Sequence, residues 1–421
     1  MYATLTIFKV RFYAWQILVL LVTFFLTEPI FNWILIRNSV IIEAYTKLLG
    51  LLVYGFMILK YKELKKEERA IIVIFSLFML RLVFESLFKY DAFFKQLTMF
   101  TVMAPVVYVV FMKYILRLID IDLLGFTAKF YMITYFVFMA LFGRGFSFSL
   151  EGIEMTDYGP YSGDGRIIHA SHVLMMIIPL LWYLHQYIMT SRRKFLWPLL
   201  ICIGIILIHQ HRSVWSAAIL ATLIYLFGAI RNRYLRPGKI VTILIGAVAL
   251  VFAFTFLAST FLPGFVEFLA DRFGEIFNPA KEGSTGNFRL EQREVYGAMF
   301  LQRPIFGWTF EGFEMPNPMV DWWPPMTGQH FHEGFMEMLF YHGIVGLLLK
   351  YAVVLYLLGK AFAKNISGNS IILVAFCCCG LLFSLNYVLP LPYWGLVGMA
   401  LFYLEVDKKN PPKHKFKPAL R

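Results

Sequence analysis

The stretch GQHFHEGFMEMLFYHGIVG, from Gly328 to Gly346, joins a polar segment of the chain to a long apolar one. Two histidines, His330 and His332, stand before its apolar run, and Gly343 and Gly346 follow that run. The apolar residues recur with helical spacing, which predicts a short helix that leads into a membrane helix.

His332 is expected at the N-terminus of the short helix, which carries Phe335, Met338, Leu339 and His342 on one face. A helix N-terminus is the positive end of the helix dipole, and it disfavours the imidazolium form of histidine. His332 is therefore predicted to be neutral and able to accept a proton at the water–membrane boundary. A histidine with no chemical role at this interface is the alternative.

The composition indicates a polytopic membrane protein. Hydrophobic residues make up 59% of the chain and charged residues 15%, and the mean hydropathy is +0.67. A soluble globular chain is about a quarter charged. The cysteines, Cys202 and Cys377 to Cys379, lie inside apolar segments and form no disulfide framework or metal-type spacing. The first apolar stretch is long enough to cross a bilayer, and we expect it to be retained rather than cleaved.

Apolar segments of about 20 residues predict an all-α polytopic fold with about twelve membrane helices. The predicted parts are membrane helices at 1–261, an extracytoplasmic loop at 262–334, further membrane helices at 335–404, and a basic tail at 405–421. Short helices are expected in the loop around Asp271 and over Arg289–Leu301. The proline- and tryptophan-rich segment Pro316–Met326 is predicted to form a lid over the membrane entrance.

The distribution of Lys and Arg predicts the topology. Alternate loops carry most of these residues, for example 60–69, 231–239 and the tail, and the positive-inside rule assigns them and both termini to the cytoplasm. Segments 143–166, 209–213 and the long loop are then extracytoplasmic. The net charge of +13 thus reflects topology and contact with the inner leaflet, since no basic loop has the aromatic pattern of a nucleic-acid surface.

Histidines and arginines gather at the predicted outer face. Six of the nine histidines are expected there: His169, His172, His209, His211, His330 and His332. For Arg144, Arg293 and Arg303, pairing with nearby acidic residues is the preferred explanation: Glu151, Asp164, Glu291 or Glu294. Arg212 opens an apolar segment with no carboxylate near it in sequence, and such a charge at the membrane edge is a functional candidate.

These features resemble the O-antigen ligase and polymerase family. In that family a His is followed after eleven residues by one Gly and after three more by another, as His332 is by Gly343 and Gly346. The family has Asn or another small polar residue after the His, and Glu333 is a departure from that pattern. Arg212, before a small residue and an apolar helix, is similar to the family's first essential arginine.

The segment from Gly286 to Phe313 resembles the loop signature of the same family. The matching positions are Arg289, Tyr296, Pro304, Gly307 and Trp308. GDGRIIHASH, from Gly163 to His172, is similar to the family's loop before the sixth span, with Arg166 in the matching place. The resemblance covers about residues 160 to 350 by motif, and the whole chain by topology.

The resemblance implies a glycosyltransferase with a GT-C-like fold that needs neither metal nor cofactor. Its donor would be a polyprenyl-diphosphate-linked glycan and its acceptor lipid A-core, at the outer face of the bacterial inner membrane. His332 is expected to be the catalytic base, and Arg212 and Arg289 to bind the diphosphate. Five residues are expected to support them: Arg166, His211, His330, Glu333 and Arg293.

Other functions stay open at this point. A polymerase that joins lipid-linked repeat units shares the motifs, and a transporter of lipid-linked sugars is a more remote alternative. His169 and His172 are one helical turn apart and are a possible metal pair. The sequence HEGFM lacks the second histidine of a zinc-protease motif, so that motif is rejected. Asp120 and Asp122 resemble a metal-binding pair of acids, but they fall in a predicted cytoplasmic loop and are interpreted as loop residues.

Overall fold

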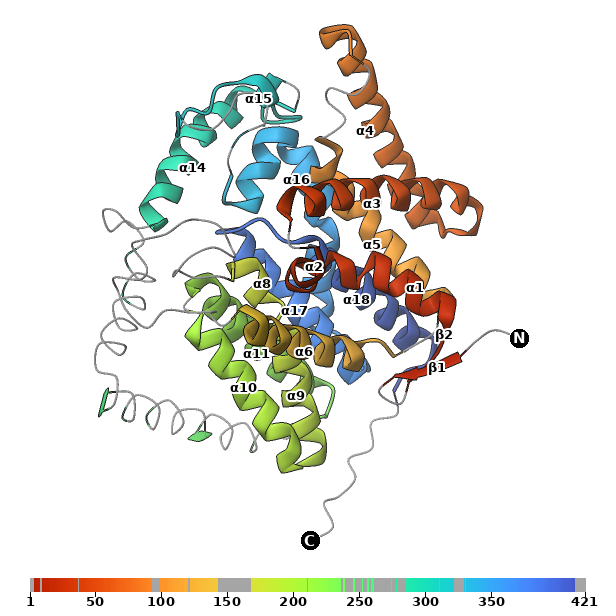
Figure 1. Ribbon diagram of the computed structural model, residues 1–421, viewed down its shortest axis with the longest axis vertical. Coiled ribbons are helices and arrows are strands. Elements are labelled where there is room, and N and C mark those ends of the chain that lie inside the picture. Colours follow the sequence, from red (N-terminus) through yellow and green to blue (C-terminus); the bar gives the residue numbers. More distant parts are fainter. Residues whose placement is uncertain are drawn as a thin grey trace. The chain divides into compact units, whose positions relative to one another are not determined.

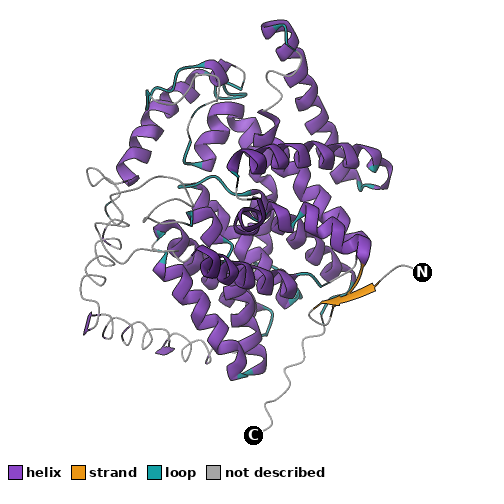
Figure 2. Cartoon of the chain, in the orientation of Figure 1, coloured by secondary structure: helices purple, strands orange, loops and turns teal. Residues whose placement is uncertain are grey.

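The computed structural model resolves the chain into two compact units. Unit 1 comprises Met1–Asp122, Arg289–Tyr356 and Ser384–Phe402, and unit 2 comprises Leu123–Phe288, Leu357–Phe383 and Tyr403–Arg421. The structure describes residues 4–7, 10–36, 38–92, 99–119, 122–142, 168–209, 211–235, 285–309, 311–321, 329 and 331–412, with isolated residues between 238 and 278. Within these residues the architecture is helical throughout, apart from one small hairpin (Figures 1 and 2).

Unit 1 is built around α5. Its elements are β1 (Thr4–Ile7), β2 (Val10–Tyr13), α1 (Ala14–Thr23), η1 (Phe25–Thr27), α2 (Pro29–Ile36), α3 (Ser39–Leu59), η2 (Tyr61–Glu63), α4 (Lys66–Tyr90), α5 (Phe100–Ile119), most of α14 (Thr285–Gln302), α15 (Glu311–Glu314), most of α16 (Gly334–Lys360) and part of α18 (Leu391–Lys409). Both α3 and α4 pack on α5, which is buried along most of its length. The outward faces of α3 and α4 expose apolar side chains such as Leu52 and Leu77.

Unit 2 is a second helical bundle. Its elements are α6 (Leu124–Phe142), α8 (Ala170–Leu174), α9 (Ile177–Thr190), η4 (Arg193–Phe195), α10 (Leu196–Ile208), α11 (Arg212–Arg231), α17 (Gly368–Ser384) and the ends of α16 and α18. Helix α9 contacts α6, α10 and α11. The buried side chain of Asn232 donates to the Ala363 carbonyl at 3.2 Å and accepts from the Ile366 N–H at 3.0 Å, which fixes the turn before α17.

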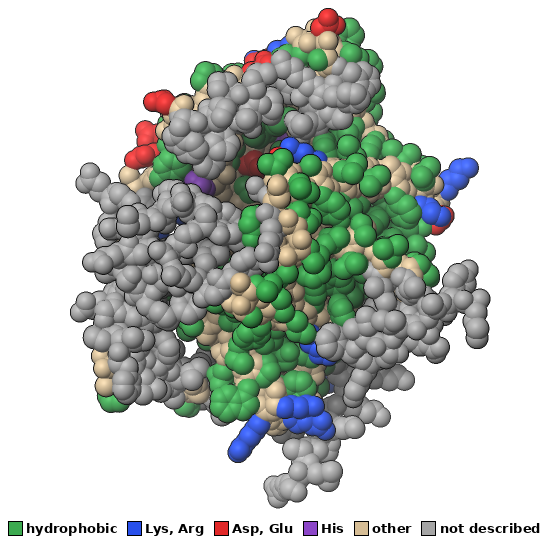
Figure 3. Space-filling view, viewed as in Figure 1, with side chains coloured by type: hydrophobic (Ala, Val, Ile, Leu, Met, Phe, Trp, Pro, Cys, Tyr) green, Lys and Arg blue, Asp and Glu red, His purple; other side chains and the backbone are tan. Residues whose placement is uncertain are grey.

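The described helices support a multi-pass membrane protein with fewer spans than predicted. Seven of them are long and apolar enough to cross a membrane, or eight if one bent pair is a single span. That count rests on length and composition. Hydrophobic side chains cover much of the described surface that is visible in Figure 3, as lipid-facing helices require. The prediction of twelve spans is not confirmed, and its span at 240–261 falls almost wholly outside the described residues.

The predicted first span, about 14–36, is broken. Leu18–Thr27 and Pro29–Ile36 meet at an angle of 102°. The Glu28 carboxylate accepts the Phe31 N–H at 2.7 Å and so caps a new helix, and Pro29 takes the first helical position, where its missing N–H costs nothing. A hydrophobicity pattern does not register this restart.

One further departure from the all-α prediction is an antiparallel hairpin, in which Thr4 pairs with Tyr13 and Ile7 with Val10. Its residues are mostly β-branched or aromatic, and such side chains favour extended pairing.

Candidate functional site

Helix α16 doubles back on itself after its first nine residues. The ring of Phe335 lies 4.7 Å from the ring of Tyr351, and Glu337 forms an ion pair with Lys350 at 3.6 Å. In a straight helix, Phe335 and Tyr351 would be about 24 Å apart at ~1.5 Å per residue. Residues 334–342 therefore fold back against the segment that follows, with Gly343 as the turning point.

Gly343 permits this turn because of its backbone conformation. Its φ of 60° and ψ of −161° belong to a region that is essentially limited to glycine. A Cβ at this position would also lie 2.4 Å from the Ile305 carbonyl oxygen. The short helix predicted to end before Gly343 is confirmed. The helix begins at Gly334, two residues after the predicted start at His332.

The loop 304–309 occupies the turning point of α16. The N–H groups of Ile344 and Val345 donate to the carbonyls of Pro304 and Ile305 at 2.9 and 3.2 Å, and the Trp308 N–H donates to the Phe340 carbonyl at 2.7 Å. Gly307, with φ of 67°, lies so close to the fold-back that a Cβ would be 2.5 Å from the Phe340 oxygen. The Pro-x-x-Gly-aromatic motif, Pro304 to Trp308, thus contacts the turn at Gly343 directly.

His332 lies in the turn before α16, next to α14. Its N–H group faces the side-chain oxygen of Gln292 at 3.4 Å, and its side chain is half-buried. Glu333 follows and accepts the Glu337 N–H through its backbone carbonyl at 3.0 Å. The predicted base thus lies just ahead of the N-terminus of α16 and is anchored to α14 through its backbone.

Arg293 and Glu333 form a two-pronged ion pair. The Arg293 Nε donates to Glu333 Oε2 at 2.9 Å, and Nη2 lies 2.8 Å from Oε1 without a hydrogen bond to it. Nη2 instead donates to the Leu385 carbonyl at 3.1 Å. Burial raises the pKa of the Glu333 carboxyl above its ordinary value, although the charges of Arg293 and Arg289 oppose that rise. The prediction that Arg293 pairs with an acid is confirmed, but the partner is Glu333 and not Glu291 or Glu294. In the same way Arg303 pairs with Glu311 at 2.7 Å.

Arg289 differs from Arg293 although both lie on α14. They are four residues apart and therefore share a face of this helix, with Gln292 between them. The guanidinium of Arg289 lies 4.9 Å from the centre of the Tyr387 ring, and its buried Nε makes no hydrogen bond to a described residue. Among the described residues no ion pair with a carboxylate within 4.0 Å occupies Arg289. Arg289 is therefore a candidate to bind an anion, and its charge also acts on the Glu333 carboxyl.

Tyr296 ties the same face of α14 to the loop before His332. Its hydroxyl is within hydrogen-bond distance of the side-chain oxygens of Gln329 at 2.9 Å and Asn317 at 3.2 Å. Gln329 also donates from its side chain to the Met315 carbonyl at 2.7 Å. Pro316–Asp321, the described part of the predicted lid, is therefore joined to α14 through Asn317. The rest of that segment lies outside the described residues.

Unit 2 has a separate cluster at the start of α11. His211 precedes this helix, and its Nε2 lies 2.7 Å from the Ile168 carbonyl, while Arg212 is the first helical residue. His209 is bonded to the Tyr135 hydroxyl at 2.9 Å, and its ring lies parallel to that of His211 at 6.4 Å. The prediction that a helix begins at Arg212 is confirmed.

Some predicted residues are not placed. Arg166 and His330 lie outside the described residues, as do Arg144, Asp120 and Asp271. The rings of His169 and His172 are 5.9 Å apart, but the described residues contain no group of three or more possible metal-ligating side chains. The roles assigned to His332, Arg212 and Arg289 stay predictions.

Sequence reasoning missed two residues at this site, Gln292 and Tyr387, and one ion pair of the α16 fold-back. Gln292 and Tyr387 carry no distinctive signal in the sequence. Glu337 and Lys350 are single charges in an apolar run. Their separation of thirteen positions gave no sign of contact, because the fold-back at Gly343 brings them together.

The part of the chain that contains these residues also matches a known protein family. Residues 197–351 match the family described as O-antigen ligase (Wzy_C), a range that includes α11, α14, the loop 304–309 and the fold-back of α16. No curated protein matches the chain. Residues 197–351 thus match an O-antigen ligase domain, within a chain whose described helices support a multi-pass membrane protein.

Proposed function

We propose that this protein transfers a glycan from a polyprenyl diphosphate to lipid A-core at the outer face of the bacterial inner membrane. The observation that carries the proposal is the cation Arg289, on the face of α14 that also contacts His332 and Glu333. A diphosphate leaving group needs fixed positive charge, and an attacking hydroxyl needs a base. The two requirements are supported by neighbouring residues of one unit.

The proposed reaction is a single displacement at the anomeric carbon of the donor glycan. The acceptor hydroxyl oxygen forms the new bond to that carbon, and His332 takes the hydroxyl proton. The bond to the diphosphate oxygen breaks, and the leaving polyprenyl diphosphate keeps the electron pair. Inversion of the anomeric configuration follows from one displacement. The step needs no oxidant, and the proposal assigns no role to a metal.

Two arginines are proposed to hold the diphosphate. The planar guanidinium forms paired hydrogen bonds to phosphate oxygens, which a lysine does not reproduce. Arg289 on α14 and Arg212 at the start of α11 are the proposed pair. Arg293 is assigned a different role, since its fork already holds Glu333. Arg166 is proposed as a supporting residue on its matching motif, and His211 and His330 on their predicted place at the outer face.

The proposed topology follows the Lys and Arg distribution, with about twelve spans, both termini in the cytoplasm and the loop 262–334 outside. Labelling of a Ser284→Cys variant in intact cells tests it. The four natural cysteines are buried, so they give little background. Labelling only after the cytoplasmic face is opened would overturn both the topology and the proposed side of the reaction.

A polymerase that uses another lipid-linked repeat unit as acceptor shares these residues. The lipopolysaccharide pattern of a strain that lacks this chain separates the two. Loss of all capped chains supports the ligase. A single repeat that remains attached to core supports the polymerase and contradicts the acceptor proposed here.

A further inference from the structure

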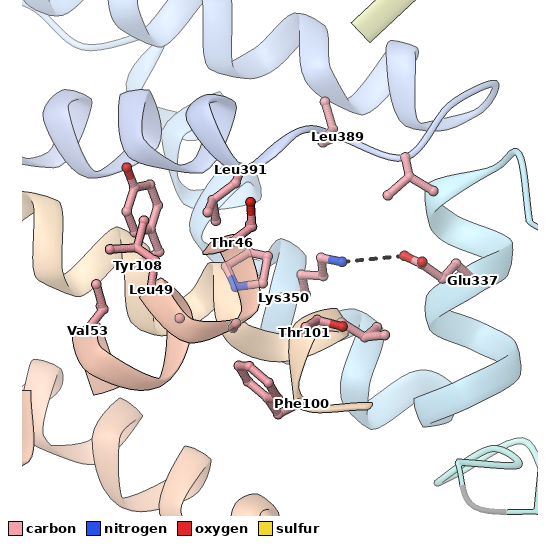
Figure 4. A pocket seen from close by; sticks show the side chains of 15 residues that line it. Thr46, Leu49, Val53, Phe100, Thr101, Tyr108, Glu337, Lys350, Leu389 and Leu391 are labelled. Atoms are coloured by element: carbon pink, nitrogen blue, oxygen red, sulfur yellow. Dashed lines mark ion pairs between the residues drawn. The ribbon is translucent and has the colours of Figure 1, made fainter. Parts of the chain in front are cut away.

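A second site in unit 1 lies against the fold-back of α16. It is a cavity of about 180 Å³ between α3, α5, α16 and the segment 388–391, and it is partly open to its surroundings (Figure 4). Most of its wall is apolar, with Leu49, Val53, Phe100, Leu389 and Leu391 among the lining side chains. A site of this kind suits the hydrocarbon part of a ligand.

One ion pair interrupts this apolar wall. Lys350 and Glu337 both line the cavity, and Lys350 is only 3% exposed. The distance of 3.6 Å from Nζ to Oε2 exceeds the ~2.7–2.9 Å of a close charge-assisted hydrogen bond. Among the described residues the buried Oε2 of Glu337 thus lacks a hydrogen bond, and the Lys350 ammonium lies 5.8 Å from the centre of the Trp394 ring.

A buried pair in this condition is costly. Removing two charges from water is compensated only when the geometry is good and further hydrogen bonds satisfy the remaining donors and acceptors. An ammonium can donate three hydrogen bonds and a carboxylate can accept several. Ionisable residues within membrane helices generally mark a functional site. A polar group that enters the cavity would supply the missing bonds.

The charges of the pair define the ligand. Lys350 and Glu337 together are neutral, so a bound anion would be repelled by Glu337 and a bound cation by Lys350. A group with one negative and one positive end satisfies both. Charged partners are favoured over neutral hydroxyls because their hydrogen bonds are about twice as strong.

The order of residues along the cavity points the same way. In Figure 4, Leu49, Val53 and Tyr108 lie on one side of Lys350, and Glu337 lies on the other. A ligand with its chain on the apolar side therefore meets the lysine first and the glutamate second. The phosphate of a zwitterionic phospholipid precedes its ammonium in this order, as counted from the acyl chains.

We propose that this cavity binds a membrane lipid with a zwitterionic headgroup, with the phosphate at Lys350 and the ammonium at Glu337. The bilayer is the source, because α3, which forms one wall, exposes Leu48 and Leu52 on its outer face. The site is distinct from the proposed diphosphate site. Its occupancy is measured without any transfer reaction, so the two proposals can fail separately.

The test is a competition for the full-length protein in detergent micelles. Equal amounts of phosphatidylethanolamine and phosphatidylglycerol with identical acyl chains are added, and bound lipids are counted by native mass spectrometry. We expect about a tenfold preference for phosphatidylethanolamine, which corresponds to ~1.4 kcal/mol. Equal binding, or a preference for the anionic lipid, contradicts the proposal.

Two further lipids sharpen the result. Phosphatidylcholine has both charges but no N–H donor, and we expect it to bind more weakly than phosphatidylethanolamine and more tightly than phosphatidylglycerol. A neutral galactosyl diacylglycerol supplies only hydroxyls. If it equals or exceeds phosphatidylethanolamine, the site recognises hydroxyl groups and the assignment of a zwitterion is overturned.

Substitutions separate a lipid site from a structural clamp. Lys350→Met and Glu337→Gln should each abolish the preference. The exchange Glu337→Lys with Lys350→Glu keeps an ion pair but reverses its order along the cavity, so we expect no preference there either. A wild-type preference in the exchanged variant would mean that the pair only holds α16 together, and would overturn the proposal.

Two more variants test the site if the substitutions of Lys350 and Glu337 prevent folding. Ala104→Phe fills the cavity from α5 and leaves the pair intact, and it should lower phosphatidylethanolamine binding about tenfold. Unchanged binding in this variant contradicts the site. The matched control is Glu43→Gln, which breaks the exposed 2.6 Å pair of Glu43 with Lys47 on α3, and neither of these residues lines the cavity. It should leave the lipid preference unchanged.

Discussion

The cluster around α14 in unit 1 and the cluster at the start of α11 in unit 2 use similar residues in different ways. At α14 one arginine is held by a carboxylate and another lies over an aromatic ring. At α11 the histidines are fixed by neutral groups, a backbone carbonyl and a tyrosine hydroxyl. The α14 cluster thus contains charged side chains, whereas neutral hydrogen bonds hold the histidine rings of the α11 cluster. Under the proposed function the α14 cluster contains the base, and His211 of the α11 cluster is a supporting residue.

The largest expected effect comes from the two histidines that this comparison separates. His332→Ala should lower transfer by about 10²–10⁴-fold, the usual cost of removing a positioned base. His211→Ala removes one neutral hydrogen bond, worth roughly 1 kcal/mol, and should lower activity only about fivefold. His330→Ala should weaken transfer without abolishing it. Activity is measured in membranes with matched expression and donor binding. A larger loss for His211→Ala would reverse the comparison.

Gly343→Ala should have the next largest effect. The conformation at this position costs other residues about 1–3 kcal/mol, and the added Cβ meets the Ile305 oxygen at 2.4 Å. We expect little folded protein, measured as yield of monodisperse protein in detergent. Gly359→Ala is the matched control, since a Cβ there has no neighbour within 4 Å. Equal yields for the two variants would contradict the fold-back of α16.

Arg289→Lys should lower activity about ten- to a hundredfold, because a hydrogen bond to a charged group is worth about 1.5–3 kcal/mol and lysine loses the fork. Arg212→Lys should behave similarly. Arg293→Lys keeps a cation beside Glu333 and should cost less. The Michaelis constants for donor and acceptor are measured separately. Full activity of Arg289→Lys would reduce that arginine to a structural role.

A smaller effect is expected for the Arg293–Glu333 pair. Arg293 is partly exposed, so Glu333→Gln should lower activity no more than about fivefold near neutral pH. The pair requires an ionised carboxyl, and burial raises the pKa of Glu333. The pair is therefore present above that pKa and lost as the pH falls through it, at higher pH than for an exposed glutamate. In Glu333→Gln the contribution of this pair to the acid limb of the pH profile should be missing, while that of the proposed base His332 remains. An acid limb identical to that of the wild type would assign it wholly to another group.

The smallest effect is expected from chelators. The proposed chemistry uses arginine charge and a histidine base, so EDTA should leave transfer unchanged. Inhibition that one added metal ion reverses would instead favour a histidine metal site, with His169 and His172 as the first candidates.

Local patterns in the sequence predicted local structure. The start of α11 at Arg212, the helix over Arg289–Leu301 and the short helix before Gly343 are all present, because each depends on apolar spacing and a terminating residue within a few positions. The prediction of the acidic partner of Arg293 was wrong. Neighbours in sequence were preferred, whereas the fold brings Glu333 from forty positions away.

The other differences between the predictions and the structure also come from contacts that the sequence pattern does not show. The bend at Glu28–Pro29 comes from a side-chain cap that hydrophobicity does not register. The pairing of Glu337 with Lys350 requires a reversal of direction that a single glycine permits. Contacts of this kind depend on tertiary geometry, and apolar periodicity carries no information about them.

The fold-back of α16 has a consequence for the surrounding bilayer. Once residues 334–342 turn back, only 344–360 remain to cross, and at ~1.5 Å per residue this length is about 25 Å. The hydrocarbon core of a typical bilayer is about 30 Å thick. Hydrophobic mismatch of this sign is relieved by local thinning of the membrane. A thinned annulus beside α16 would shorten the distance between the two aqueous phases at the place where the candidate base resides.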